Sequence, residues 1–459
     1  MRKIEPWAHA SPEERRQDGR ERRKQVPRKS HAAWTPAPDR PDLIKLLRAQ
    51  DADRQQDLVP IRWGRMSASP FTFYRGSAAL MAADLAPLPR TGLQVQLCGD
   101  AHLSNFGMYA SPERSLLFDV NDFDETLPGP FSWDIKRLAA SFVLGARSNG
   151  FTEEEARDIT LASVRSYREH MAAFAEMREM DVWYSHVVAD DLLEMFRANR
   201  PPKIVKRIDA GLAKARTRDS VQAAGKLTEI VDGERRFTDQ PPVLMHLEEL
   251  SSADDSAHTL FHQYAATLED DRRELIERFD LVDVARKIVG VGSVGTRCIV
   301  VLLRGRDIDD PLILQIKEAT HSVLEAYLGR SRFPHAGHRV VAGQRLMQAA
   351  SDIFLGWMTG PGGRYFYWRQ LRDMKASVDV ATLRPPGLEL YAEACGWALA
   401  RGHARSGRRI AISAYMGVGD RFDQAIAEFA VAYANQTEKD YELVMKAITK
   451  GDIPVQTGV

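Results

Sequence analysis

The chain has 459 residues, of which 44% are hydrophobic and 27% are charged, a composition typical of globular proteins and unlike that of disordered or fibrous ones. Because 63 basic side chains balance 63 acidic ones, no overall charge favours nucleic acid or an anionic membrane as a partner. The length exceeds that of one ordinary hydrophobic core, so two lobes are expected.

Residues 1–60 are rich in charged residues and proline, and they contain a basic cluster. Its members are Arg15, Arg16, Arg20, Arg22, Arg23, Lys24, Arg28 and Lys29. This composition predicts a solvated, partly disordered arm that leads into a helix near 43–52. The alternative is an arm that contacts phosphate groups.

The cysteines, Cys98, Cys298 and Cys395, lie far apart, which excludes a disulfide framework and a CxxC zinc site. A reducing, cytoplasmic location is therefore expected. No charged stub followed by an apolar run opens the chain, so no signal peptide is expected. The longest apolar runs are too short to span a bilayer.

Hydrophobic periodicity and turn residues predict the elements in chain order. The first part has strands at 93–97 and 115–120, an acidic turn at 121–125, a helix at 133–144 and a mostly helical stretch, with a loop at 233–242, over 151–280. The second part has strands at 284–289, 297–303, 311–316, 339–348 and 365–372, and a short helix at 320–328. Helices at 388–404 and 421–448 follow.

Two acidic segments follow the first two predicted strands: GDAHLSN at 99–105 and NDFDE at 121–125. Phosphoryl transfer needs a carboxylate that orients the attacking hydroxyl and oxygen ligands for Mg²⁺. Asp100, Asn105 and Asp122 supply these groups if a hairpin brings the two segments together. Ordinary acidic turns are the alternative.

GDAHLSN resembles the catalytic loop of aminoglycoside-phosphotransferase-type and other small-molecule kinases, and DVNDFDE (119–125) resembles their metal-binding segment. The resemblance implies that Asp100 is the catalytic base and that Asn105 and Asp122 are metal ligands. Asp124, in the same acidic turn, is a further candidate metal ligand. His102 is a further candidate of the catalytic loop, expected to orient the loop or Asp122 rather than to act on substrate. Trp133-Asp134-Ile135 resembles the helix that follows in the same fold, which implies that Asp134 supports the catalytic loop.

A glycine-rich stretch, GVGSVGTR, lies between two predicted strands at 290–297. Because glycines let backbone N–H groups approach phosphates, the residues expected to contact a nucleotide are Gly290, Gly292, Ser293 and Gly295. The next strand ends in Lys317, which matches the phosphate-binding lysine of protein kinases. Its expected partner is Glu325, with Glu318 as the alternative. The simpler alternatives are that the glycine-rich stretch is only a hairpin turn and that Lys317 is a solvated lysine at the end of a strand.

The order of these segments is unusual, because a kinase ordinarily has its glycine-rich lobe before its catalytic loop. Here the catalytic loop comes first. Either the fold is circularly permuted or one of the two matches is accidental. Residues 391–404 resemble the helix that precedes a kinase catalytic loop, and their position late in the chain favours permutation.

The chain also resembles a bacterial family of unknown function, domain-of-unknown-function family 2252, over nearly its whole length. The matching segments include GDAHLSNFG (99–107), NDFDET (121–126), WDIKRLAAS (133–141), GVGSVGTR (290–297) and LQIKEA (314–319). No activity is established for this family, so the function has to be inferred from the site residues.

Together these features predict an α+β, two-lobed, kinase-like fold that is circularly permuted and carries a helical insertion. Its parts are a basic arm (1–60), a helical lobe with the catalytic loop (61–280), a small β-rich nucleotide-binding lobe (281–375) and helices that complete the helical lobe (376–459). The expected activity is transfer of phosphate from ATP, with Mg²⁺, to a hydroxyl group of a small molecule. The alternatives are a nucleotide-binding pseudokinase, an AMP-transferring enzyme and a metal-dependent phosphohydrolase.

Several lesser candidates remain. Arg75, after an aromatic run, either lies near phosphate or forms a surface ion pair. The basic segment 369–375 either lines the cleft or ends a strand. His258 and His262 share a helix face, but without a third ligand they favour a solvated or packed pair over a zinc site.

Overall fold

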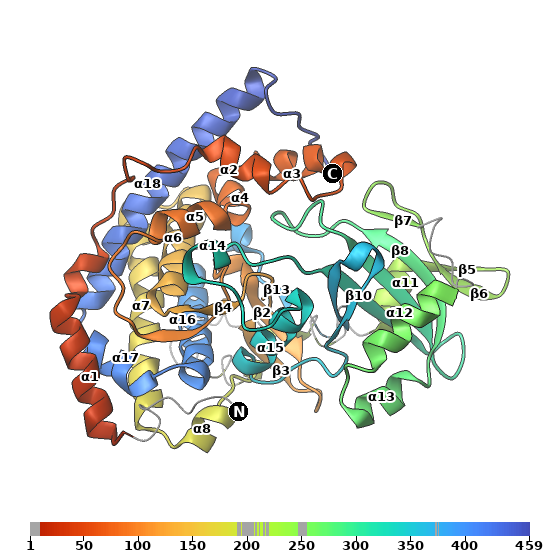
Figure 1. Ribbon diagram of the computed structural model, residues 1–459, viewed down its shortest axis with the longest axis horizontal. Coiled ribbons are helices and arrows are strands. Elements are labelled where there is room, and N and C mark those ends of the chain that lie inside the picture. Colours follow the sequence, from red (N-terminus) through yellow and green to blue (C-terminus); the bar gives the residue numbers. More distant parts are fainter. Residues whose placement is uncertain are drawn as a thin grey trace.

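The computed structural model describes residues 10–190, 220–246, 255–371, 374 and 376–459, and seven single positions at 194, 206, 209, 210, 212, 213 and 216. The longest helices gather on one side of the molecule and the largest sheet lies on the other (Figure 1). All sheets are antiparallel among the described strands, so the expected α+β class is confirmed.

The helical side is built around a core that joins segments from both halves of the chain. Its helices are α6 (Ser132–Ser148), α7 (Glu153–Glu176), α16 (Pro385–Ser406), α17 (Arg409–Met416) and α18 (Arg421–Thr449). Helices α7 and α16 approach closely because Gly396 has no side chain: a Cβ there would lie 2.2 Å from the carbonyl oxygen of Ser163. The predicted helices at 133–144, 388–404 and 421–448 are confirmed.

The sheet side has six strands in the order β11-β12-β10-β9-β8-β7. They are β7 (Leu244–His246), β8 (Asp280–Lys287), β9 (Cys298–Arg304), β10 (Pro311–Glu318), β11 (Gly356–Thr359) and β12 (Tyr365–Gln370). Successive residues of a strand point to opposite faces. Leu314 accordingly packs with α12 (Asp255–Ala265) and α13 (Asp270–Ile276), and Ile313 packs with α11 (Ser220–Leu227).

Small sheets lie between these two sides (Figure 1). Strand β1 (Gln94–Leu97) pairs with β4 (Leu127–Pro130), and β2 (Phe106–Ala110) forms a hairpin with β3 (Leu116–Val120). The two-residue strand β13 (Ala376–Ser377) pairs with β2. A further pair, β5 (Thr228–Val231) and β6 (Glu234–Phe237), extends from the sheet side.

The expectation of a partly disordered arm is wrong for residues 12–25, which form helix α1 (Pro12–Gln25) along α17. Ser11 and Glu14 make a capping box at its start, and its basic side chains have acidic partners such as Asp18 and Glu176. Short helices follow: α2 (Leu43–Ala49), η3 (Gln56–Leu58), α3 (Val59–Met66), α4 (Pro70–Arg75) and α5 (Ala78–Leu85).

Other local predictions need correction. Residues 339–348, predicted as a strand, belong to helix α15 (Ala336–Met347), whose first turn is capped by the His335 side chain. The helix expected at 320–328 is only the turn α14 (Glu325–Leu328). The loop expected at 233–242 contains β6. Helices α11, α12 and α13, expected in the helical lobe, pack on the six-stranded sheet instead, because their apolar side chains cover it. Within the described residues, no helix combines the length and apolar character needed to cross a bilayer.

Candidate functional site

The loop after β1 is held in place by a buried carboxylate. Asp134, on α6, accepts hydrogen bonds from the backbone N–H groups of Cys98 (2.8 Å) and Gly99 (3.2 Å). Gly99 has φ +89°, and a Cβ there would lie 2.3 Å from the Glu125 carbonyl oxygen, so glycine is required. His403 Nε2 lies 3.3 Å from the same carboxylate. The predicted support of this loop by Asp134 is confirmed by these contacts.

Asp100, the predicted base, projects from this loop toward a cavity. Its Oδ1 accepts a 2.7 Å hydrogen bond from Arg137 Nε, and its Oδ2 lies 3.7 Å from His102 Nε2. Burial raises the pKa of Asp100, and the positive charge of Arg137 opposes that rise. Arg137 was not among the predicted site residues, although it lies one turn after Asp134 on the same helix.

His102 is a buried, uncharged neighbour of Asp100. Burial lowers its pKa well below the ordinary value, and the charges of Arg75 and Arg137 lower it further. Its Nδ1 has no hydrogen-bond partner among the described residues. The Nδ1 atom can therefore form a hydrogen bond with a ligand, and the lowered pKa disfavours a role for the imidazole as a cation for phosphate.

The β2–β3 hairpin brings the acidic turn beside the loop, as expected from the spacing. Phe106 pairs with Val120, and the N–H of Asn121 donates to the Asn105 carbonyl at 2.8 Å. The side-chain Nδ2 of Asn105 donates to the Asp100 carbonyl at 2.8 Å. This bond occupies the NH₂ end of the amide and leaves its oxygen as the end suited to a metal. Asn105 and Asp122 line the same cavity.

Lys317 reaches the acidic turn from strand β10. Its Nζ lies 2.5 Å from Asp124 Oδ2 and 3.5 Å from Asp122 Oδ1, although the residue is only 2% exposed. Burial alone would lower the pKa of Lys317, but Asp122 and Asp124 raise it well above the ordinary value. The Tyr367 hydroxyl donates to Asp124 Oδ1 at 2.6 Å and fixes that carboxylate.

The predicted glutamate partners of Lys317 are wrong. Glu325 faces His321 (3.0 Å) and Arg339 (3.9 Å) instead. Glu318 pairs with Arg297 and Arg364. Among the described residues, neither glutamate forms an ion pair with Lys317. The aspartates of the acidic turn take that place, a contact between segments far apart in sequence that local spacing did not reveal.

The glycine-rich loop between β8 and β9 covers one side of the cavity. Gly290, Gly292 and Ser293 line it. Gly295 does not: its carbonyl accepts from the N–H of Gln55 at 2.8 Å, and its Cα faces the Arg54 side chain. The backbone around Arg54 and Gln55 therefore holds the far end of the loop, a contact the sequence did not predict.

The resulting cavity has a volume of about 140 Å³ and combines carboxylates with guanidinium groups. The basic residues in its wall are Arg54, Arg62 and Arg75. Burial and the charge of Arg54 lower the pKa of Arg62 to about 9, and Asp51, 2.9 Å from its Nη1, opposes this shift. The Nε of Arg75 has no hydrogen-bond partner in the described part of the chain. Arg75 lines the cavity, and its proximity to phosphate stays a prediction.

The donor set fits Mg²⁺ better than a transition metal. Asn105, Asp122 and Asp124 offer oxygen atoms, the ligands that Mg²⁺ prefers. Among the described residues, no three His, Cys, Asp or Glu side chains are grouped so that they could hold a metal. His258 and His262 therefore have no third ligand of these kinds for a zinc site. A divalent cation here would have two protein carboxylates and one amide, leaving positions for phosphate and water.

The basic segment 369–375 is only partly described, since 372, 373 and 375 lie outside the described residues. Arg369 donates to Gln315 Oε1 at 2.9 Å and to the Asn121 carbonyl at 3.3 Å. It thus ties strand β12 to the acidic turn rather than lining the cavity.

Comparison with known proteins gives one match. A family model described as an uncharacterised protein conserved in bacteria (DUF2252) matches residues 54–447. Neither the curated proteins nor the solved structures contain a match. Because residues 54–447 make up well over half of the 459-residue chain, the chain belongs to the bacterial family DUF2252.

Proposed function

We propose that this protein is an ATP- and Mg²⁺-dependent phosphotransferase that acts on a hydroxyl group of a small molecule. One observation carries the proposal: Asp100, Asn105, the two aspartates of the acidic turn and Lys317 meet beside a glycine-rich loop. Each of these groups has a role in phosphoryl transfer, and the chain brings them together from segments far apart in sequence.

The proposed roles follow from the chemistry of each side chain. Lys317 and Arg75 bind phosphate oxygens, and Asn105, Asp122 and Asp124 hold the metal ion. When bound, Mg²⁺ neutralises charge on the phosphates. Asp100 accepts the proton of the acceptor hydroxyl, and a pKa raised by burial brings it closer to the operating pH of a base. Catalysis on this reading is mostly positioning and electrostatic stabilisation.

The proposal includes a circularly permuted kinase-like fold. In such a fold, the helix before the catalytic loop comes from the C-terminal part of the chain. Two contacts support this arrangement: the backbone N–H of Gln96 donates to Ser406 Oγ at 3.1 Å, and Gly407 lies against the Gln94 carbonyl. The end of α16 thus meets the start of β1, where an unpermuted chain would be continuous.

A second candidate is a protein that binds a nucleotide without transferring phosphate. The 2.7 Å contact between Arg137 and Asp100 Oδ1 favours it, because the guanidinium charge lowers the pKa of the carboxylate and so weakens Asp100 as a base. AMP transfer would use the same residues with the nucleotide reversed. A metal-dependent phosphohydrolase would use only the two acidic segments and would be indifferent to Lys317.

The test combines nucleotide binding with turnover. Thermal unfolding is measured with ATP and Mg²⁺ for the wild type, Asp122→Ala and the surface control Asp271→Ala, whose side chain is 68% exposed. Ligand at about 100 times Kd should stabilise the folded state by roughly 2.7 kcal/mol, and only Asp122→Ala should lose this gain. In an acceptor screen that follows ADP formation, Asp100→Ala should reduce the rate by about 10²- to 10⁴-fold.

Several outcomes would count against the proposal. A well-folded sample that gains no stability from any nucleotide would refute it. Cleavage of p-nitrophenyl phosphate without ATP, unchanged in Lys317→Ala, would favour the phosphohydrolase. Binding of ATP without turnover in any acceptor screen would favour the nucleotide-binding protein, and transfer of labelled AMP to an acceptor would favour the AMP transferase.

A further inference from the structure

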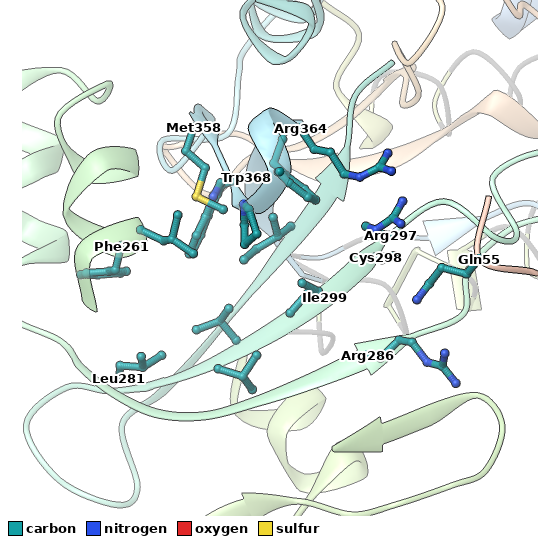
Figure 2. Close-up of a pocket in the computed structure, with 17 residues that line it drawn as sticks. Gln55, Phe261, Leu281, Arg286, Arg297, Cys298, Ile299, Met358, Arg364 and Trp368 are labelled. Atoms are coloured by element: carbon teal, nitrogen blue, oxygen red, sulfur yellow. The ribbon is translucent and has the colours of Figure 1, made fainter. Parts of the chain in front are cut away.

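A second cavity, of about 410 Å³, lies on the face of the six-stranded sheet that α12 covers (Figure 2). This volume falls within the range of small-molecule sites, roughly 300–1,000 Å³. Figure 2 shows apolar side chains, among them Phe261, Leu281 and Met358, at one end. The guanidinium groups lie at the other end. The two ends differ enough in character to define the chemistry of a ligand.

The polar end carries more positive than negative charge. Arg297 and Arg364 share one carboxylate, that of Glu318, with Nη1 to oxygen distances of 3.1 and 2.9 Å. Arg286 pairs with Asp57 at 2.9 Å. Three guanidinium groups therefore face two carboxylates. Arg297 and Arg364 keep 31% and 37% of their side-chain surface exposed, which leaves N–H donors available at the mouth of the cavity.

The shared carboxylate indicates which anion this end prefers. Arginine N–H groups bind carboxylates strongly, and here the Nη1 groups of two arginines already hold the Glu318 carboxylate. A ligand carboxylate would bind the remaining donors of the same two guanidinium groups. Glu318 lines the cavity that contains Asp100 and Asp122, so a ligand bound to Arg297 and Arg364 would alter the charge beside that cavity.

The apolar end contains an unsatisfied donor. Trp368 is 2% exposed and stacks on Tyr264 with ring centres 4.2 Å apart. Its Nε1–H has no hydrogen-bond partner among the described residues, whereas a buried indole N–H usually has one. Glu318 pairs with Phe366, two residues before Trp368, a separation of roughly 7 Å along the strand. An acceptor a few bonds from the ligand carboxylate would reach this donor.

We propose that the cavity binds a small organic acid with an apolar chain and a hydrogen-bond acceptor close to its carboxylate, the chemical class of the N-acyl amino acids. The carboxylate binds Arg297 and Arg364, the acceptor binds the indole N–H of Trp368, and the chain lies over Ile299 and Val301 on β9. This binding does not depend on the proposed phosphotransferase activity.

The test uses calorimetric titration of the full chain with three probes. N-octanoylglycine has the charge, the amide acceptor and the chain, its methyl ester lacks the charge, and decanoate lacks the amide. We expect N-octanoylglycine to bind roughly tenfold tighter than the ester and several-fold tighter than decanoate, because hydrogen bonds to charged groups contribute more than neutral ones.

Single substitutions separate the contributions. Arg364→Gln should weaken N-octanoylglycine roughly tenfold and leave the ester unchanged. Trp368→Phe should remove the advantage over decanoate and keep the apolar surface. Glu318→Gln should strengthen binding, since it frees two arginines. Arg304→Gln, at the end of β9 and paired with Glu234 outside the cavity, should change nothing.

Three results would overturn the proposal. The first is no heat of binding from any probe with folded protein. The second is an ester that binds as tightly as the acid. The third is an affinity for N-octanoylglycine that Arg364→Gln leaves unchanged. Arg364 is partly exposed, so its substitution is not expected to prevent folding.

Discussion

The two sides of the molecule use buried residues differently. The helical side contains buried charges, such as the pair between Arg401 and Asp119, which lie 2.5 Å apart and are each 1% exposed. The core between the sheet and α12 is formed by apolar side chains, among them Phe261, Leu314 and Trp368. The buried charges connect helices from the end of the chain to the strands and loops of the site. The apolar core gives the sheet a rigid platform for Lys317.

The largest expected effect is loss of the buried ion pair. Arg401→Ala leaves the Asp119 carboxylate buried and without its cation, which costs about 3–5 kcal/mol. Equilibrium unfolding in urea, followed by circular dichroism, measures the change. Arg306→Ala, at a side chain 80% exposed, is the control and should stay within about 0.5 kcal/mol of the wild type. A loss below about 1 kcal/mol for Arg401→Ala would show that the helical side tolerates the charge unpaired.

A smaller effect is expected from the sheet. Leu314 is fully buried, and Leu314→Ala should reduce the free energy of unfolding by about 3 kcal/mol through lost burial and a cavity. Leu314→Met keeps the volume and should cost less than about 1.5 kcal/mol. Conservative substitutions show the contrast between the two regions most clearly. Leu314→Met keeps the apolar volume, whereas Arg401→Lys cannot reproduce the guanidinium geometry. If Leu314→Met reduced the free energy of unfolding as much as Leu314→Ala, the sheet core would depend on the exact shape of the leucine side chain and not only on its apolar volume.

Per pH unit, the smallest expected effect is a pH dependence of stability on the helical side. Burial, with a smaller contribution from the charge of Lys136, lowers the pKa of His31 from 6.5 to about 3. Between these values the unfolded chain binds a proton that the folded protein does not. Stability from this group is therefore fully present above pH 6.5 and decreases as the pH falls, by up to about 1.4 kcal/mol per pH unit. Urea unfolding at several pH values, compared with His31→Gln, isolates this slope.

Between pH 6 and pH 4, the free energy of unfolding should depend less steeply on pH in His31→Gln than in the wild type. Equal slopes for the two proteins would mean that His31 is protonated in the folded state. Its contact with the Tyr415 hydroxyl, 2.8 Å from Nε2, would then have to accommodate a charge.

Local sequence patterns predicted the parts of the site that lie close together in the chain. The loop after β1, the β2–β3 hairpin and the three central strands of the sheet follow from short apolar runs separated by glycine or acidic turns. The proximity of Asn105 and Asp122 is a consequence of that hairpin. Asp134 was located through its resemblance to a known helix, and its contacts agree.

Contacts between distant segments could not be predicted in this way. The partners of Lys317 lie in a hairpin almost two hundred positions earlier, and 193 residues separate it from Asp124. Residues 336–347 were misjudged because their short apolar runs suit a buried strand and a helix equally well. Helix α1 is ordered because it packs on α17, and the charged composition of this segment does not reveal that contact.

The packing of α16 and α18 on α6 and α7 has a consequence for synthesis. The loop and hairpin that carry Asp100 and Asp122 emerge from the ribosome early, but the helices that cover their core are made last. Until residue 449 has left the exit tunnel, the parts of α6 and α7 that α16 and α18 cover stay exposed, although α6 and α7 can already pack on each other. The nascent helical side must therefore stay soluble while the sheet side is translated.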